Sequence, residues 1–244
     1  MSHEKADYYK KLEPVFRFGL DRKFDRSVTG TENIPEEPAI YAPNHIRFED
    51  SLLVAVSYTE ATGIPMRFAA KQEYFDGKGL DDKGKFGRSI RWIMEHGRMI
   101  PVDREGSSPR AFQTLQEQVG DRLTNGDAVA LHPEGTRSED GKLHKFKSGA
   151  SRIALAYSAP IVPVGIVYSK YSNNNKTHVD IEFGQPVMPS EYTHLPYSIL
   201  PGRRKAEHLI QVVEDRVSDM TGMPQSGTFA QLRKLRHLGD ERRQ

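Results

Sequence analysis

Short apolar runs that alternate with longer amphipathic segments are the feature that most restricts the fold of this chain. Residues 39–42 read as a short buried strand, and residues 51–56, after a polar turn, read as the start of a helix with an apolar face. The alternation continues along most of the chain, as is typical of α/β domains. We therefore predict one α/β domain, with a mixed sheet of roughly seven strands flanked by helices and a short N-terminal amphipathic helical segment. The predicted strands lie near residues 26–28, 39–42, 66–69, 99–102, 128–131, 161–167 and 179–183.

The segments between these strands predict helices, and one of them has well-defined ends. Ser108 is a suitable N-cap, Pro109 suits the first helical position, and Asn125 followed by Gly126 ends the helix. Helices are predicted directly after Asp50 and at residues 86–95, 109–123, 148–157 and 203–220.

The two ends of the chain differ from this pattern. Residues 4–24 carry apolar residues at roughly helical spacing between Lys and Arg residues, and Pro14 is expected to break or restart that helix. A basic amphipathic segment of this kind either rests in a lipid interface or packs onto its own domain, and the sequence leaves both readings open. We divide the chain into an N-terminal segment (1–25), a central domain (26–222) and a basic C-terminal tail (223–244).

Composition excludes several classes of protein. A net charge of +2 over 244 residues argues against a dedicated nucleic-acid binder. The absence of cysteine removes disulfides, thiolate zinc sites and a cysteine nucleophile. The longest weakly polar or apolar run, residues 159–168, is far shorter than a membrane span of about 20 residues, so we expect a chain that is soluble or lies on a membrane. Neither a metal nor a cofactor is predicted, and His96, His144 and His178 are interpreted as ordinary surface residues.

One polar turn carries residues suited to proton transfer. His45 follows the predicted strand at 39–42, and Asp50 begins the next helix. Within one straight helix, side chains five residues apart would point about 140° away from each other, so a pair requires His45 to lie outside the helix. An imidazole held by a carboxylate is fixed in tautomer, and its reference pKa of about 6.5 suits a general base. The alternative is a solvated His and an Asp that only complements the helix dipole.

Other polar clusters also follow the ends of predicted strands. Lys71, Arg104 and the segment 132–138, which contains Arg137, each come directly after such a strand. In α/β sheets, ligands bind at the carboxyl ends of strands, and the planar guanidinium fork of Arg is suited to phosphate oxygens. The residues therefore favour a cleft for a hydroxyl-bearing phosphate. The competing interpretation is that Arg104 and Arg137 form structural salt bridges, to Asp103 or Glu134.

These motifs, in this order, resemble the glycerolipid acyltransferase family, which includes bacterial 1-acylglycerol-3-phosphate acyltransferases. The resemblance covers roughly residues 15–190. The PEGTRS run is its most specific part, and Gly135 within it suggests a positive φ or a close backbone approach to a ligand. The four matching blocks are Asn44-His45 with Asp50, GRMIPVDR at 97–104, PEGTRS at 133–138 and IVPVGI at 161–166.

The resemblance implies transfer of a fatty acyl group from a thioester, on coenzyme A or acyl carrier protein, to the free hydroxyl of 1-acylglycerol-3-phosphate, giving phosphatidic acid. His45 would be the general base, oriented by Asp50, and no acyl-enzyme would form. Arg104 and Arg137 would bind the acceptor's phosphate. The further implied site residues are Glu134, Gly135 and Thr136 in the acceptor site, Lys71 as another phosphate contact and Asn44 as a brace of the turn.

The chain departs from many relatives in one respect. It has only the interrupted basic segment at its N-terminus in place of a strongly apolar anchor. We expect a cytoplasmic protein that is peripheral on the inner face of the cell membrane, with an acyl donor and a lysophospholipid as partners and no nucleic acid. Two alternatives are an acyltransferase for another hydroxyl acceptor, which includes other lysophospholipids and soluble acceptors, and a non-catalytic lipid-binding protein.

Overall fold

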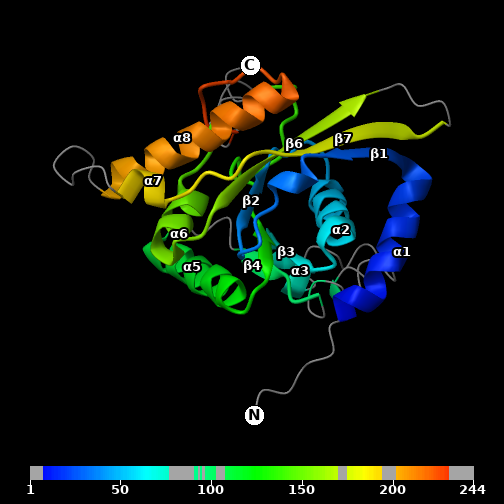
Figure 1. Ribbon diagram of the computed structural model, residues 1–244, viewed down its shortest axis with the longest axis horizontal. Helices are drawn as coiled ribbons and strands as arrows, with labels where there is room; N and C mark the ends of the chain where they lie inside the picture. Colours follow the sequence, from blue (N-terminus) through cyan, green and yellow to red (C-terminus); the bar gives the residue numbers. More distant parts are fainter. Residues whose placement is uncertain are drawn as a thin grey trace, which may run out of the picture.

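A seven-stranded mixed sheet forms the centre of the computed structural model, which describes residues 8–76, 91, 92, 94, 97–102, 108–169, 175–193 and 202–230. The strand order is β1-β7-β6-β2-β5-β3-β4. The five strands from β6 to β4 run parallel, whereas β7 is antiparallel to β6 and β1 is parallel to β7. The predicted α/β domain with a mixed seven-stranded sheet is therefore confirmed (Figure 1). The elements are α1 (Tyr8–Lys23), β1 (Phe24–Thr29), η1 (Thr31–Asn33), β2 (Ile40–Pro43), α2 (Asp50–Thr62), β3 (Met66–Lys71), α3 (Glu73–Asp76), β4 (Ile100–Val102), α5 (Pro109–Thr124), β5 (Ala128–Ala130), α6 (Gly149–Tyr157), β6 (Ile161–Ser169), β7 (Thr177–Phe183), α7 (Ser190–Thr193) and α8 (Gly202–Thr221).

Helices cover both faces of the sheet, and each face has its own hydrophobic core. Helices α1 and α2 pack on one face, and α5, α6 and α8 pack on the other (Figure 1). Alternate strand residues supply the two cores, so that Tyr41 faces α2 while Ile40 and Ala42 face the opposite side. Burial on both faces explains why the central strands are continuous apolar runs rather than alternating ones.

Several predicted boundaries match the structure in detail. Ser108 caps α5, since its side chain accepts a hydrogen bond from the backbone N–H of Ala111 at 3.1 Å, and Pro109 is the first helical residue. The predicted helix at 86–95 lies mostly outside the described residues, although residues 91, 92 and 94 are helical.

The prediction that Pro14 breaks the N-terminal helix was wrong, because α1 runs through it from Tyr8 to Lys23. A proline removes one backbone hydrogen bond, and here the loss falls in the second turn, near the helix end. Beyond Pro14, Phe16 packs against the core and Leu20 is buried in it. Tertiary packing therefore outweighs the local penalty.

No helix in the described part of the chain is both long enough and apolar enough to cross a membrane.

Residues that follow the predicted boundary at residue 222 make backbone contacts with the rest of the domain. Residues after α8 return to the domain, where the backbone of Leu143 bonds to Pro224 and to Ser226, and Lys145 bonds to Thr228. Ala230 is buried. Residues 223–230 therefore belong to the domain, and residues 231–244 lie outside the described residues.

Candidate active site

His45 and Asp50 form a buried pair at the carboxyl end of β2. The turn between strand and helix keeps His45 outside α2, and its Nδ1 lies 3.0 Å from Asp50 Oδ2. Because an ionised carboxylate can only accept, the Nδ1 atom carries the proton and Nε2 is left with a free lone pair. The ring of His45 borders a pocket, so this arrangement can accept a proton from a bound hydroxyl group.

Asp50 is the most extensively bonded side chain of the site. It is fully buried, and Oδ2 also accepts the backbone N–H groups of Ile46 at 2.6 Å and Arg47 at 2.7 Å. Oδ1 accepts the hydroxyl of Tyr168, from the carboxyl end of β6, at 2.5 Å. Burial acts to raise the pKa of Asp50, but the hydrogen bonds from His45 and Tyr168 and the nearby His132 hold it below its ordinary value. Asp50 is thus a fixed negative charge beside His45.

Hydrogen bonds made by the side chains of Asn44 and Glu134 hold the turn between β2 and α2 in place. The side chain of Asn44 donates to the carbonyl of Ile166 at 2.9 Å and accepts the Ile166 N–H at 2.8 Å, which ties the turn to β6. Glu134 accepts the backbone N–H of His45 at 2.7 Å through Oε1 and that of His144 at 3.0 Å through Oε2. Asn44 is thus bonded to β6 through both its side-chain nitrogen and its side-chain oxygen.

The sequence led us to expect Glu134 in the acceptor site, and the structure places its side chain beneath the turn of His45. The side chain is fully buried beneath the turn, and both of its oxygens are occupied by backbone amides. Among the described residues, Glu134 forms no ion pair with Arg137, which was the alternative suggested by the sequence. Burial, together with the charges of Asp50 and Glu214, raises the pKa of Glu134 to about 7, although the two amide hydrogen bonds oppose this. Glu134 acts on the site by positioning its backbone.

We expect Glu134→Gln to destabilise the fold, because the new NH₂ group faces one of the two backbone N–H donors. One buried amide without an acceptor costs about 1–3 kcal/mol. The ordinary pKa of a glutamate is 4.5, and in the folded protein that of Glu134 is about 7. Between these two pH values the folded protein holds a proton on Glu134 that the unfolded chain has lost. The wild-type unfolding free energy therefore falls as pH rises through this window, and the Gln variant lacks that component. Denaturant melts at pH 5 and pH 7.5 measure both effects.

Glu214→Gln is the matched control for this measurement. Glu214 is also buried, but among the described residues it accepts one backbone N–H, that of Phe146 at 2.6 Å, and its other hydrogen bond is to the side chain of Gln211. A glutamine oxygen can replace the acceptor of the one backbone N–H, and the side chain of Gln211 can rotate to pair with the new amide, so we expect a smaller loss of stability. Equal losses in the two variants would contradict the assigned role of Glu134.

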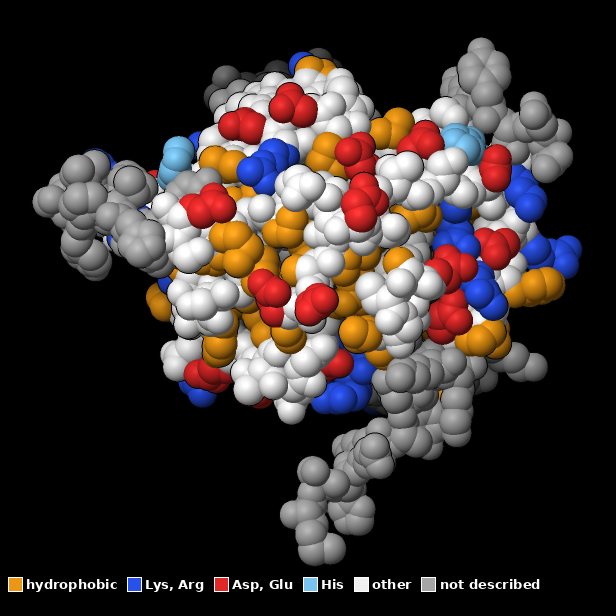
Figure 2. All heavy atoms as spheres, in the orientation of Figure 1, with side chains coloured by type: hydrophobic (Ala, Val, Ile, Leu, Met, Phe, Trp, Pro, Cys, Tyr) orange, Lys and Arg blue, Asp and Glu red, His pale blue; other side chains and the backbone are white. Residues whose placement is uncertain are grey.

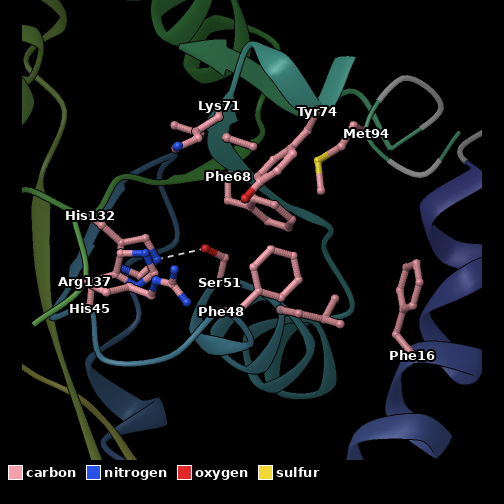
Figure 3. A pocket seen from close by; sticks show the side chains of 13 residues that line it. Phe16, His45, Phe48, Ser51, Phe68, Lys71, Tyr74, Met94, His132 and Arg137 are labelled. Atoms are coloured by element: carbon pink, nitrogen blue, oxygen red, sulfur yellow. Dashed lines mark hydrogen bonds between the residues drawn. The ribbon is translucent and has the colours of Figure 1, made fainter. Parts of the chain in front are cut away.

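A pocket of about 180 Å³ opens beside His45 and has two chemically distinct ends. Figure 3 shows His45, His132, Arg137 and Ser51 on one side and the aromatic side chains on the other. Such a division suits a ligand with a polar head and an apolar tail. The apolar end is lined by Phe16 from α1 together with Phe48, Leu52, Phe68, Tyr74 and Met94.

The structure places two of the three cationic residues expected at the site on the pocket. Lys71, at the end of β3, and Arg137, after β5, both line the pocket. Lys71 Nζ also lies 3.8 Å from Glu73, in an exposed pair of little energetic weight. Thr136 directly precedes Arg137 in the same loop and is partly buried. Arg104 lies outside the described residues.

Gly135 adopts the left-handed conformation that its sequence context suggested. Its φ is +72°, and a Cβ atom there would lie 2.7 Å from Nζ of Lys147. The expected close approach is therefore made by a neighbouring side chain of the protein, and only glycine fits without strain.

Sequence reasoning missed three residues near the His45–Asp50 pair. His132 stacks on His45, Ser51 bonds to His132 at 2.8 Å, and Tyr168 bonds to Asp50. Both His132 and Tyr168 lie near the carboxyl ends of strands, which was the available signal.

The interpretation of His144 as a surface residue was wrong, because it is buried and its Nε2 lies 3.1 Å from Asp140. No cluster of three or more His, Asp or Glu suited to a metal occurs among the described residues.

Comparison with known proteins gives one family match and several relatives. A family model described as "Acyltransferase" matches residues 25–167. The chain is 28% identical over 143 residues to the 1-acyl-sn-glycerol-3-phosphate acyltransferase of Escherichia coli (strain K12), covering 54% of this chain and 56% of that protein. It is 29% identical over 143 residues to the chloroplastic 1-acyl-sn-glycerol-3-phosphate acyltransferase LPAT1 of Arabidopsis thaliana, covering 58% of this chain and 35% of the relative.

A relative from Mycoplasma pneumoniae and a solved structure extend the comparison. The former, a probable 1-acyl-sn-glycerol-3-phosphate acyltransferase, is 28% identical over 146 residues, covering 58% of this chain and 49% of the relative. This chain thus spans between about a third and just over half of the length of these curated relatives. The crystal structure of the 1-acyl-sn-glycerophosphate (LPA) acyltransferase PlsC from Thermotoga maritima has the same fold, with a TM-score of 0.61, 24% identity and coverage of 90% of this chain and 83% of that one.

Proposed function

The chain belongs to the acyltransferase family, and we propose that it transfers a fatty acyl group from an acyl thioester to the free hydroxyl of 1-acylglycerol-3-phosphate, giving phosphatidic acid. The observation that carries this proposal is the His45–Asp50 pair, whose imidazole lines one pocket together with cationic and apolar side chains. Relatives from three organisms are named for this reaction. The donor is a thioester of coenzyme A or of acyl carrier protein.

The proposed reaction is a direct displacement at the thioester carbonyl. Nε2 of His45 takes the proton from the acceptor hydroxyl as that oxygen attacks the carbonyl carbon. Asp50 stabilises the imidazolium that forms, and the C–S bond then breaks as His45 returns the proton to the leaving thiolate. The hydroxyl comes from the substrate, so no nucleophile of the protein is needed.

Ser51 is poorly placed to serve as a nucleophile instead. Its hydroxyl lies 2.8 Å from Nε2 of His132, the group that would have to remove its proton. Burial and the neighbouring His45 lower the pKa of His132 to about 3, which makes it a weak base. This supports direct transfer without an acyl-enzyme.

The cationic wall gives the acceptor its place in this scheme. Arg137 and Lys71 lie on the pocket beside His45, where they can hold a phosphate while the hydroxyl reaches Nε2. We assign Arg104 to the same phosphate from its position after β4, together with Gly135 and Thr136 in the loop of Arg137. The aromatic end of the pocket is left for the acyl chains.

Product analysis with a mixed acceptor pool tests the assignment. Purified protein, one acyl thioester and a pool of lysophosphatidic acid, other lysophospholipids and glycerol 3-phosphate are incubated, and the products are identified by mass spectrometry. We expect phosphatidic acid as the main product. If a different acceptor is acylated, that acceptor and not 1-acylglycerol-3-phosphate is the substrate. Binding without any product would favour a lipid-binding protein.

Helix α1 offers a surface for contact with the membrane that holds such lipids. Val15 and Phe18 are each 64% exposed, and the guanidinium of Arg22 lies 5.6 Å from the centre of the Phe18 ring. Figure 2 shows basic, acidic and hydrophobic side chains side by side over the α1 side of the molecule. We propose that the protein works peripherally at the inner, cytoplasmic face of the cell membrane, with α1 at the lipid interface.

Replacing both Val15 and Phe18 by Ser is expected to weaken binding to anionic vesicles at least about tenfold, since two exposed apolar side chains no longer enter the interface. Co-sedimentation with vesicles measures the partitioning. Ile64→Ser, which changes an exposed residue just after the end of α2, is the matched control. Equal binding of the double variant and wild type would reject α1 as the contact surface.

A further inference from the structure

The ring of His132 lies directly against the ring of His45. Their centroids are 4.0 Å apart and their planes differ by only 19°, so the two imidazoles are stacked face to face. His132 follows β5, next to β2 in the sheet, which brings the two residues together at one edge. In Figure 3 the two rings overlap at the polar end of the pocket.

Both ring nitrogens of His132 are held. Nδ1 lies 3.1 Å from the carbonyl oxygen of Asn44 and 3.3 Å from that of Pro43. Carbonyl oxygens only accept, so Nδ1 carries the proton, and Nε2 accepts from the hydroxyl of Ser51 at 2.8 Å. Bonds at both sides of the ring prevent it from rotating. His132 is therefore a fixed surface, anchored to the same turn that carries His45.

The ring of His45 itself is held less completely by its hydrogen bonds. Asp50 bonds only to Nδ1, so within the tolerance of that one hydrogen bond the ring can still turn about its Cβ–Cγ bond. Any such turn moves Nε2, which lies off that axis. A parallel ring at 4.0 Å limits that freedom, because a turn in either direction brings one edge of the His45 ring against His132.

The charge state of His132 also fits this arrangement. Burial and the nearby His45 lower the pKa of His132, so it stays uncharged at neutral pH. A charged neighbour would oppose the positive charge that His45 acquires during proton transfer, whereas a neutral aromatic face does not.

We propose that His132 is a positioning residue for His45, a fixed aromatic platform that keeps Nε2 of His45 facing the pocket, and that Ser51 acts only by anchoring this platform. The inference rests on the proposed function, in which His45 is the general base. The contribution of His132 lies in the flat ring, while Ser51 contributes through its hydrogen bond to that ring.

Four variants separate these contributions: His132→Phe, His132→Ala, Ser51→Ala, and the double variant His132→Phe with Ser51→Ala. His132→Ala removes the stack, and we expect kcat to fall by about 10- to 100-fold, since small misplacements of a catalytic group are costly, with the acceptor KM changed less than about twofold. His132→Phe keeps a flat neutral ring and is expected to retain at least about a third of kcat. Ser51→Ala alone lowers kcat a few-fold, and in the Phe background it lowers kcat no further.

The kinetic results can overturn either part of the proposal. If His132→Phe is as impaired as His132→Ala, the stacked ring is not what matters. If Ser51→Ala still lowers kcat in the Phe background, Ser51 contacts substrate directly. Circular dichroism and thermal melts of all four variants show whether a loss of kcat comes from unfolding.

An NMR measurement tests the platform without relying on turnover. The imidazole ¹⁵N spectrum, with the His45 signals assigned through His45→Gln, reports the tautomer and mobility of that ring. We expect a single Nδ1-protonated form in wild type and His132→Phe, and mixed or broadened signals in His132→Ala. Unchanged His45 signals in folded His132→Ala would overturn the proposal, whereas absence of acyl transfer in wild type would reject the proposed function alone.

Discussion

His45→Ala is expected to lower the rate of acyl transfer by about 10²–10⁴-fold, the usual contribution of a positioned general base. The loss should appear in kcat, because the cationic and apolar side chains that line the rest of the pocket stay in place. The backbone N–H of His45 still bonds to Glu134 in the variant, so the turn keeps its anchor. Initial rates of phosphatidic acid formation from acyl thioester and lysophosphatidic acid measure the effect.

His178→Ala is the matched control for this loss. His178 also pairs with carboxylates, at 3.1 Å from both Asp25 and Asp180, but on an exposed part of the surface away from the pocket. We expect a wild-type rate from this variant. If His45→Ala and His178→Ala have the same rate as wild type, His45 is not the base.

Asp50→Asn is expected to lower kcat by about 10²–10³-fold while the protein stays folded. The amide oxygen takes the place of Oδ2, because the N–H groups of Ile46 and Arg47 and Nδ1 of His45 all require an acceptor there. The NH₂ group then faces the hydroxyl of Tyr168, which can turn to accept. The tautomer of His45 is thus retained, and the loss reports the missing negative charge.

Tyr168→Phe separates this charge effect from a loss of packing. It removes the hydroxyl that bonds to Oδ1 but leaves the carboxylate and its three other hydrogen bonds, so we expect a loss of less than about tenfold. Thermal melts of both variants show whether the fold survives. A rate for Asp50→Asn equal to that of Tyr168→Phe would contradict the electrostatic role of Asp50.

Local patterns were sufficient to predict the sheet and most of its helices. Strands such as β2 are short and buried on both faces, so they stand out as continuous apolar runs. The start of α5 was readable from Ser108 and Pro109, since caps depend on residues that are adjacent in the chain. Pro14 misled the prediction because the packing of Phe16 and Leu20, which the local sequence does not show, outweighs its penalty.

Only those residues of the candidate site that directly follow a predicted strand could be predicted from the sequence. His45, Lys71 and Arg137 were found because the carboxyl ends of neighbouring parallel strands meet at one edge. The hydrogen bond from Tyr168 to Asp50 joins residues 118 positions apart, so the sequence around either residue does not predict it. The buried role of Glu134 was missed for the same reason, since its partners are backbone amides that leave no mark in the sequence.

The most direct test of the proposed function is the release of free thiol from an acyl thioester by purified protein, with and without lysophosphatidic acid. We predict thiol release that depends on the acceptor, is matched mole for mole by phosphatidic acid, and is lost in His45→Ala. Thiol release at the same rate without acceptor, or no release with it, would contradict the proposal that His45 activates the hydroxyl of a lysophosphatidic acceptor.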